Sequence, residues 1–344
     1  MKNTYFSTFI TGLQEIVDIS LKRDFPDAEI VLLLDGLVVY RTNQSLQKVK
    51  ELRCLNNTFL LFKLFENISG EKPIEIMMRR VMEDSNTMDK LPNGLTLNNS
   101  TFRVVASQEN QLVSVNKQLL EQIERLFKAK LNLLRVNRSK SDFEVWFLWR
   151  TEDRGFVGLR LTKTPNHEKT LHKGELRPEL ANLMCAISEP ASSDVFLDPY
   201  AGYGSIPIER AIAFPYKQII ANEKDPATLK ILEDKVKQIK QKIVVEKWNA
   251  LDLNYLKDNS VDKIITDPPW GVFTSQEVDF NDFYSRMLKE FTRVIKPGGL
   301  IVILMGRKDL FEQVLGRFSS LSPVKKYDTL VSGKKAAIFK LRSN

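Results

Sequence analysis

From Val195 onward the chain alternates short runs of β-forming residues with stretches of helical pattern. In the last of these stretches Phe283, Met287 and Phe291 recur four residues apart, which places them on one face of a helix. We predict strands over 195–197, 218–221, 243–248, 263–266 and 299–304, and helices over 205–213, 226–240 and 283–295. Parallel strands are joined by right-handed helical crossovers, so this alternation predicts a doubly wound α/β domain.

The tail over 324–341 is typical of two strands joined at Ser332-Gly333-Lys334, which predicts an antiparallel hairpin at the sheet edge. The first half alternates less regularly and predicts an α+β region. Its expected elements are a helix over 12–23, a hairpin over 30–34 and 37–41 around Asp35-Gly36, and a strand, helix, strand and strand over 101–106, 116–129, 143–150 and 155–161. The polar, turn-rich residues 165–169 predict a linker.

Composition excludes several classes of protein. No run of about 18 apolar residues occurs, so we predict no transmembrane helix. The first residues carry acids within their apolar stretch, which is not typical of a signal peptide. The chain has two cysteines, Cys54 and Cys185, and two histidines, His167 and His172. Their spacing is not that of metal ligands, so we expect no metal site and no disulfide. We therefore expect a reducing, cytoplasmic setting. We also expect a monomer.

The net charge of +8 is compatible with a polyanionic partner without requiring one. One local run is more strongly basic, since it carries five cations and no acid. These are Lys128, Lys130, Arg135, Arg138 and Lys140. The run predicts either a solvated helix end or a patch that contacts the phosphates of RNA.

The segment after the first predicted strand of the second half carries an acid and two glycines before a helix. Asp198 precedes the loop that contains Gly202 and Gly204. Such a loop lets the backbone approach a ligand closely, and the helix N-terminus adds unpaired N–H groups. A dinucleotide site would carry a third glycine, and a carboxylate here would repel phosphate. A cationic ligand, an ammonium beside a sulfonium, fits better; a plain strand–turn–helix is the alternative.

Polar residues also follow the next two predicted strands. Glu223 stands about twenty residues beyond the loop, a spacing at which an acid reaches the ribose hydroxyls of a bound nucleoside. Asp225, before Pro226, suits a helix N-cap. Asn249 could accept a hydrogen bond from an adenine amino group, or it could be a turn residue.

Together, the segments LDPYAGYG, NEKD, WNALD and TDPPWG resemble those of class I S-adenosylmethionine-dependent methyltransferases. The Asp267-Pro268-Pro269-Trp270 sequence is similar to the D/N-P-P-[YFW] signature of methyltransferases that act on nucleobase amino groups. Upstream, residues 172–181 (HKGELRPELA) resemble the L-R-P segment before this domain in THUMP-containing RNA methyltransferases. The opening helix and the stretch from Leu52 to Leu61 also resemble that family.

The resemblance implies S-adenosyl-L-methionine as the cofactor and a Rossmann-like methyltransferase sheet. It implies an N-terminal α+β, ferredoxin-like domain over 1–60, a THUMP-like RNA-binding domain over 61–165, a linker over 166–175 and the methyltransferase domain over 176–344. The implied cofactor-binding residues are Arg177, Pro178, Asp198, Tyr200, Gly202, Gly204, Glu223, Asn249 and Asp267.

The resemblance also implies a function for the DPPW segment, with Asp267, Pro268 and Trp270 as catalytic residues. An exocyclic amino nitrogen is a poor nucleophile because its lone pair is delocalised into the ring. A carboxylate and a proline carbonyl can accept both amino hydrogens and aim the lone pair at the sulfonium methyl, while the prolines hold these acceptors rigidly. Trp270 can stack on a base taken out of its helix; an apolar cap on the core is the alternative.

The expected function is that of a cytoplasmic RNA methyltransferase that makes N2-methylguanosine, in tRNA first of all. Ribosomal RNA guanine and adenine N6 are alternative substrates. An inactive methyltransferase domain in an RNA-binding protein is an alternative of another class. The intact acids Asp198, Glu223 and Asp267 argue against it.

Overall fold

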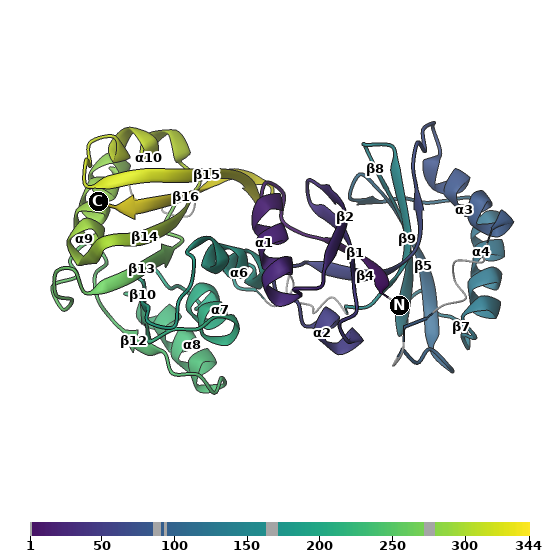
Figure 1. The fold of residues 1–344 in the computed structure, drawn as a ribbon, viewed down its shortest axis with the longest axis horizontal. Coiled ribbons are helices and arrows are strands. Elements are labelled where there is room, and N and C mark those ends of the chain that lie inside the picture. Colours follow the sequence, from purple (N-terminus) through teal and green to yellow (C-terminus); the bar gives the residue numbers. More distant parts are fainter. Residues whose placement is uncertain (1, 85–90, 93–94, 163–170, 272–278) are drawn as a thin grey trace. The chain divides into compact units, whose positions relative to one another are not determined.

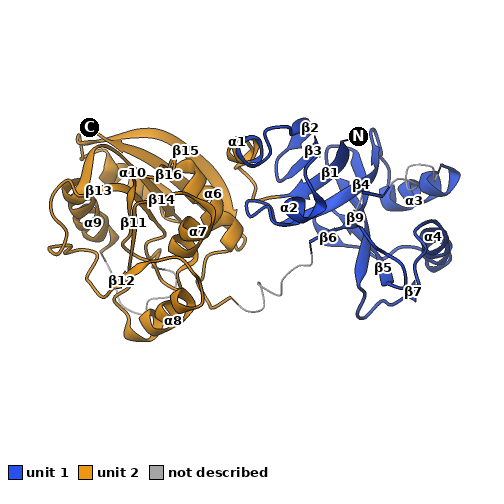
Figure 2. Cartoon of the chain, turned by 60° about the horizontal axis from the view of Figure 1, so that its bottom comes forward, with its two compact units in different colours: residues 1–8, 21–164 blue, residues 9–20, 165–344 orange. Residues whose placement is uncertain are grey.

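The computed structural model describes residues 2–84, 91–92, 95–162, 171–271 and 279–344. The chain divides into two compact units, coloured separately in Figure 2. Unit 1 consists of residues 1–8 and 21–164, and unit 2 of residues 9–20 and 165–344. The first half of the expected linker over 166–175, residues 166–170, lies outside the described residues.

Unit 1 contains one nine-stranded sheet of order β2-β3-β1-β4-β9-β8-β5-β6, with β7 paired to β5. The hairpin expected around Asp35-Gly36 is confirmed, because Leu34 pairs with Leu37. The strands are β1 (Asn3–Thr8), β2 (Glu29–Leu34), β3 (Leu37–Thr42), β4 (Asn57–Phe65), β5 (Thr101–Gln108), β6 (Gln111–Leu112), β7 (Arg135–Val136), β8 (Phe143–Arg150) and β9 (Arg154–Arg160). The helices within it are α2 (Leu46–Lys50), α3 (Pro73–Glu83) and α4 (Lys117–Lys130).

The sheet of unit 1 is continuous across the boundary that we expected between residues 60 and 61. That boundary lies inside β4, which pairs with β1 on one side and with β9 on the other. The stacked rings of Phe6 and Phe59, with centroids 4.5 Å apart, lie where β1 and β4 meet. A division of unit 1 into two domains stays a prediction.

Unit 2 contains a seven-stranded sheet of order β12-β11-β10-β13-β14-β16-β15 (Figure 1). Its strands are β10 (Val195–Asp198), β11 (Gln218–Asn222), β12 (Val244–Glu246), β13 (Val261–Thr266), β14 (Ile295–Met305), β15 (Leu321–Val331) and β16 (Lys334–Ser343). The strands from β10 to β14 pair in parallel, and β16 is antiparallel to both β14 and β15. The doubly wound sheet and its antiparallel edge hairpin are therefore confirmed.

Helices cover the sheet of unit 2 because each presents an apolar face to it. They are α6 (Pro178–Ile187), α7 (Ser205–Ala213), α8 (Pro226–Lys237), α9 (Phe280–Val294) and α10 (Lys308–Leu315). In α9 the expected residues Met287 and Phe291 are fully buried, and Phe283 packs at the edge of the same core. Because this core also holds β10 and β13, it fixes the strand ends that carry the acids.

Residues 9–20, which include the start of α1 (Gln14–Asp24), pack on the edge hairpin of unit 2. The Thr329 hydroxyl donates a hydrogen bond to the Thr11 carbonyl oxygen at 2.8 Å, and Lys325 pairs with Glu15. Gly12 has a left-handed φ of +84°, and a Cβ there would stand 1.8 Å from the Asp328 carbonyl oxygen. Sequence patterns could not show this contact, because about 300 residues separate its two sides.

We predict that Gly12→Ala destabilises the protein more than Gly333→Ala does. Both glycines have left-handed φ values, +84° and +77°, so both variants lose about 1–2 kcal/mol from backbone strain. Only Gly12 lacks room for a methyl group, which adds about 1–3 kcal/mol of overpacking. Urea unfolding of the full chain measures the difference, and equal losses in the two variants would contradict the packing of 9–20 on the hairpin.

Candidate active site

Three carboxylates lie at the carboxyl edge of the parallel sheet in unit 2. Asp198 ends β10, Glu223 follows β11 and Asp267 follows β13. β10 and β13 pair directly, although β11 and β12 come between them in the chain. The strand order reverses at this point, and open α/β sheets bind ligands in the crevice there.

Asp198 is completely buried. Its Oδ1 accepts hydrogen bonds from the Thr266 hydroxyl at 2.8 Å and from the Tyr200 N–H at 3.2 Å. Its Oδ2 is buried without a hydrogen-bond partner in the described structure. Burial raises the pKa of Asp198 to about 8, and the negative charges of Asp267 and Glu223 act in the same direction.

The backbone conformation of the loop after β10 and the space around it account for both of its glycines. Gly204 has a φ of +91°, and a Cβ there would stand 2.6 Å from Leu232 Cδ1. Gly202 has a φ of +53° and faces open space, since a Cβ there would meet no atom within 4 Å. Its N–H donates to Glu223 Oε2 at 3.1 Å, and the Asp225 N–H donates to Glu223 Oε1 at 2.8 Å. Each carboxylate oxygen keeps a lone pair for a ligand hydroxyl.

Asn222, the last residue of β11, holds this edge together, and sequence reasoning missed it. Its side-chain Nδ2 donates to the Pro199 carbonyl at 2.9 Å, and its Oδ1 accepts from the Trp248 N–H at 2.6 Å. The side chain therefore ties the loop after β10 to the loop after β12. A polar residue directly before Glu223 was the available signal, but its burial could not be read from the sequence.

Two of the expected polar residues take part in local backbone structure. Asp225 caps α8, since its Oδ1 accepts from the Thr228 N–H at 2.8 Å, which confirms the N-cap. The exposed Asn249 forms a turn in which its Oδ1 accepts from the Leu251 N–H at 3.1 Å. The contact of Asn249 with adenine stays a prediction.

The remaining expected cofactor residues lie on two segments. Arg177 is the N-cap residue of α6 and Pro178 is its first residue. The Ser205 hydroxyl donates to the Leu176 carbonyl at 2.7 Å, so the segment before α6 is joined to the start of α7. The Tyr200 ring lies 6.0 Å from the Phe283 ring, and its hydroxyl is buried without a hydrogen-bond partner among the described residues.

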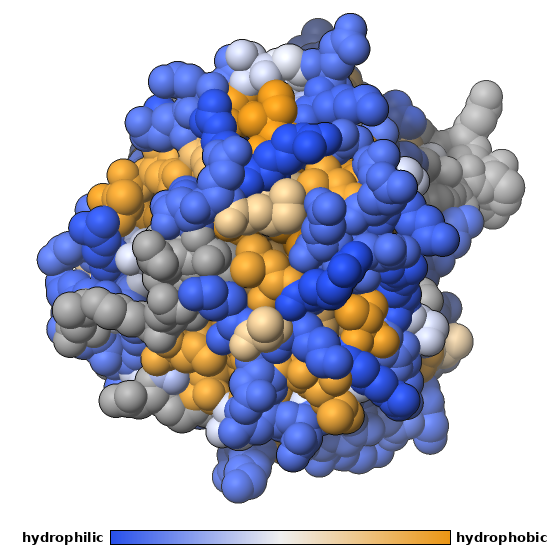
Figure 3. Space-filling model, turned by 90° about the vertical axis from the view of Figure 1, so that its right-hand side faces the viewer, coloured by the Kyte–Doolittle hydropathy of each residue, from blue (hydrophilic) through white to orange (hydrophobic). Residues whose placement is uncertain are grey.

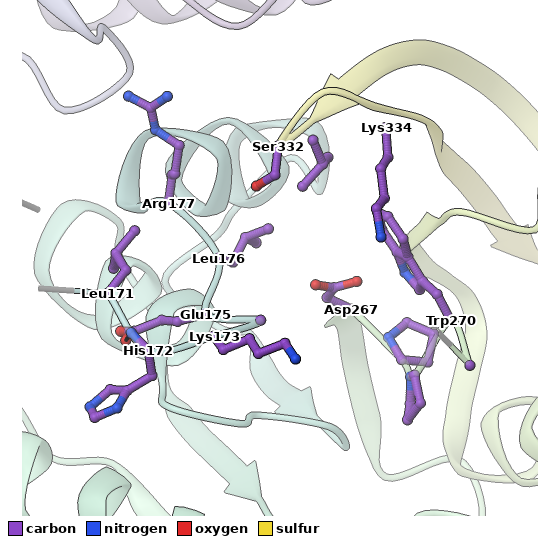
Figure 4. Close-up of a pocket in the computed structure, with 15 residues that line it drawn as sticks. Leu171, His172, Lys173, Glu175, Leu176, Arg177, Asp267, Trp270, Ser332 and Lys334 are labelled. Atoms are coloured by element: carbon purple, nitrogen blue, oxygen red, sulfur yellow. Dashed lines mark hydrogen bonds between the residues drawn. The ribbon is translucent and has the colours of Figure 1, made fainter. Parts of the chain in front are cut away.

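A pocket of about 560 Å³ lies beside Asp267. Figure 4 shows the residues that line it. Its lining includes residues 171–177, 267–271, Val331, Ser332 and Lys334. Asp267 Oδ1 and Trp270 Nε1 are both buried, and neither has a hydrogen-bond partner in the described part of the chain. Burial raises the pKa of Asp267 to about 7, and the nearby indole N–H of Trp270 offsets this only in part.

Contacts to both the ring and the main chain fix the position of Trp270. A Cβ on Gly306, which follows β14, would stand 2.4 Å from a carbon of the indole, so the ring lies directly on the glycine. Arg307 Nε donates to the Trp270 carbonyl at 2.9 Å, and its guanidinium lies 4.5 Å from the Phe280 ring centroid. Trp270 is only half-buried and lines the pocket. Sequence reasoning missed Gly306 and Arg307, and no motif around them gave a signal.

The fit of this edge to the implied cofactor can be tested on its atoms. Asp198 Oδ2 is a buried acceptor without a partner in the described structure, which favours a ligand that carries positive charge and donors. The open space at Gly202 allows a ligand to approach the backbone. No three histidine, cysteine or acidic side chains group as metal ligands in the described residues. S-adenosylmethionine, a cation whose ribose hydroxyls can donate hydrogen bonds, fits these carboxylate acceptors.

The five expected RNA-binding cations lie in unit 1. Lys128 and Lys130 are in the last turn of α4, Arg135 is in β7, and all five side chains are exposed. Arg138 forms an ion pair of 2.8 Å with the buried Glu124, which raises the pKa of Arg138. Figure 3 shows the face that bears α3 and α4, where hydrophilic surface surrounds hydrophobic patches. Both interpretations of the run, helix end and phosphate contact, remain predictions.

The strand order and the glycine loop after β10 define a class I methyltransferase domain, whose cofactor is S-adenosylmethionine. A family model for RMKL-like methyltransferase domains, UPF0020, matches residues 165–335. A Methanothermococcus thermolithotrophicus protein named "Probable tRNA (guanine(10)-N2)-dimethyltransferase" is 30% identical over 38% of this chain and 81% of that protein. The chain belongs to the RNA guanine-N2 methyltransferase family that shares this domain, and the resemblance found in the sequence is confirmed.

Two further comparisons extend beyond that domain. The tRNA (guanine(6)-N(2))-methyltransferase THUMP3 of Bos taurus is 29% identical over 59% of this chain. The chain spans 44% of the length of that bovine protein. The crystal structure of TrmN from Thermus thermophilus has a TM-score of 0.78 at 20% identity and covers 99% of both chains. Nearly the whole chain therefore shares the fold of that protein.

The described helices were also compared with the length and hydropathy that a membrane span needs. None of them reaches both.

We predict that Gly306→Ala impairs methyl transfer by displacing the Trp270 ring. The added methyl group would stand 2.4 Å from the indole, whereas at Gly316 the nearest atom would be at 3.6 Å, an ordinary contact. Gly306→Ala should lower kcat/KM for RNA at least about tenfold, or about 1.4 kcal/mol, with donor affinity retained. Gly316→Ala is the matched control; full activity of Gly306→Ala would refute the packing argument.

We predict that Asp198 makes the protein less stable as the pH rises toward 8. Its pKa is raised above the unfolded value, so its contribution to stability is fully present below about pH 4. That contribution is lost as the pH rises through about 8. In Asp198→Asn, the unfolding free energy should therefore fall less between pH 5 and pH 8 than in the wild type.

The control is Asp225→Asn, the same change at an exposed N-cap where asparagine serves as well. Hydrogen bonds from Thr228 lower the pKa of Asp225, so this variant should keep the wild-type dependence above pH 5. Urea titrations at each pH give the measurement. Identical curves for Asp198→Asn and the wild type would contradict the burial of an ionisable group at this position.

Proposed function

We propose that this chain is an S-adenosylmethionine-dependent methyltransferase that makes N2-methylguanosine in RNA, with tRNA as the first substrate. One observation carries the proposal: a buried, unpartnered Asp267 oxygen at the end of β13 precedes Pro268 and a fixed Trp270. The names of the bovine and archaeal relatives support guanine and tRNA. Adenine and ribosomal RNA are the alternatives, and nothing specific in the site favours them.

The acids at the sheet edge would bind the methyl donor. Glu223 would accept the ribose hydroxyls, because each of its oxygens already holds one backbone N–H and keeps a lone pair. Asp198 would face the positive charge of the donor, which favours its ionised form. The backbone at Gly202 gives the ligand room. Arg177, Pro178, Tyr200, Gly204 and Asn249 complete the proposed binding set.

Asp267 and Pro268 would prepare the amino group for transfer. Bound S-adenosylmethionine supplies an electrophilic methyl carbon. Asp267 and the Pro268 carbonyl accept the two amino hydrogens and turn the nitrogen lone pair toward that carbon. The two acceptors would hold the nitrogen in this orientation while it receives the methyl group. The nitrogen then loses one proton to Asp267 or to solvent.

Trp270 would stack on the target base after it leaves the RNA helix, which is worth about 1–3 kcal/mol. Its carbonyl is fixed by Arg307 and its ring lies on Gly306, so the stacking face is in place before the substrate arrives. Unit 1 would supply RNA affinity through phosphate contacts, including the run from Lys128 to Lys140. We propose that the protein acts as a monomer in the cytoplasm.

We predict that Asp267→Ala lowers kcat at least about 100-fold, or about 2.7 kcal/mol, while S-adenosylmethionine affinity stays nearly unchanged. Asp267→Asn should retain part of the activity, because its amide oxygen can still accept a hydrogen bond. Transfer of a labelled methyl group to unmodified tRNA measures kcat, and calorimetry measures donor affinity. If Asp267→Ala loses donor binding and thermal stability together, the residue has a structural function and the proposal is wrong.

A further inference from the structure

One wall of the pocket beside Asp267 is a segment without regular secondary structure. Residues 171–177 form this wall, and none of them belongs to a helix or strand. Residues 172–174 are exposed, and Gly174 has a φ of +85° with no atom within 4 Å of a Cβ placed there. Core packing therefore does little to fix this part of the wall, and its position depends on the side-chain contacts that it makes.

Tyr203, in the glycine loop after β10, contacts this wall through its ring. The His172 ring stacks on the Tyr203 ring, with centroids 4.3 Å apart and an angle of 11° between the planes. Lys235 of α8 places its ammonium group 5.7 Å from the centroid of the same tyrosine ring. Figure 4 shows the His172 ring pointing away from Asp267. The stack therefore fixes the wall without filling the pocket.

Glu175 joins the other members of this group of side chains. Its side chain is only 6% exposed and forms an ion pair with Lys235. The same carboxylate accepts the His172 N–H at 3.0 Å. Helix α8, which carries Lys235, is packed in the core of unit 2 through the fully buried Leu232. The wall, the glycine loop and α8 are therefore joined by one closed set of contacts.

The glycine loop is also the part of the site that the proposed function gives to the methyl donor. Gly202, directly before Tyr203, faces open space, and its N–H donates to Glu223, the acid proposed for the donor ribose. A ligand that fills this space restricts the backbone next to Tyr203 and so restricts the orientation of the tyrosine ring. The ring in turn contacts the wall at His172.

We infer that Tyr203 is a positioning residue that couples donor binding at the glycine loop to the pocket for the target base. With the donor in place, the Tyr203 ring is fixed, and the stack on His172 holds the wall in the position that receives the base. RNA therefore binds more tightly to the protein that already carries the donor. This inference rests on the proposed function and assigns Tyr203 a part in it that is separate from methyl transfer itself.

The experiment measures binding of the full-length protein to an unmodified tRNA transcript with and without saturating S-adenosylhomocysteine, which has no methyl group to transfer. The ratio of the two affinities is the coupling factor. It should be about fivefold or more in the wild type, and Tyr203→Leu should lower it to less than about twofold. Tyr203→Phe keeps the stacked ring and should keep the wild-type factor. Because coupling is reciprocal, tRNA should change the affinity for S-adenosylhomocysteine by the same factors.

Two further variants make the test specific to the stack. His172→Ala removes the stack from the exposed side, where no core packing is lost, and should also abolish the coupling. Tyr216→Leu is the matched control, because it makes the same change at another half-buried tyrosine, which precedes β11 at the opposite edge of the sheet. Its coupling factor should equal that of the wild type.

The inference is overturned if the wild type binds both ligands without coupling, or if Tyr203→Leu and His172→Ala keep the wild-type factor. An equal loss of coupling in Tyr216→Leu overturns it as well. A wild type that shows the coupling but methylates no RNA refutes the proposed function instead, and the assignment of Tyr203 then still stands on the binding data.

Discussion

The hydrogen bond from the Thr266 hydroxyl to Asp198 joins the ends of β10 and β13, the two strands between which the sheet order reverses. The rest of the site depends on this junction. The same Asp198 oxygen receives the Tyr200 N–H and so sets the start of the glycine loop. Asp267 directly follows Thr266, so its position is fixed by the same contact. Asp198, which we propose to face the methyl donor, and Asp267, which we propose to accept the amino hydrogens, are therefore held by the same contact.

The edge that results is acidic. Asp198 and Glu223 lie there together, and burial disfavours ionisation of Asp198 unless a cation compensates it. Asp267 follows the neighbouring strand β13 and lines the pocket beside this edge. A positively charged methyl donor at the two acids and a base in the pocket would therefore meet at Asp267.

Sequence patterns predicted the parts of the protein that depend on local order. The limits of α7 coincide with the expected helix over 205–213, and α9 buries the expected face. Contacts between distant residues could not be predicted, because no local pattern records them. Thr11 with Thr329, Asn222 with Trp248 and Gly306 with Trp270 are of this kind. At Asn249 and Arg138 the difficulty is different. Side chains whose chemistry suits a ligand also form a local turn at Asn249 and an ion pair at Arg138, and the sequence alone does not separate these uses.

The central claim is that Asp267, Pro268 and Trp270 direct a methyl group to the exocyclic nitrogen of guanosine. Nucleoside mass spectrometry of tRNA from cells with and without the gene tests it most directly. The account predicts that N2-methylguanosine falls in tRNA when the gene is deleted and returns when the wild-type gene is restored. Loss of N6-methyladenosine instead, or an unchanged set of methylated nucleosides, would contradict it.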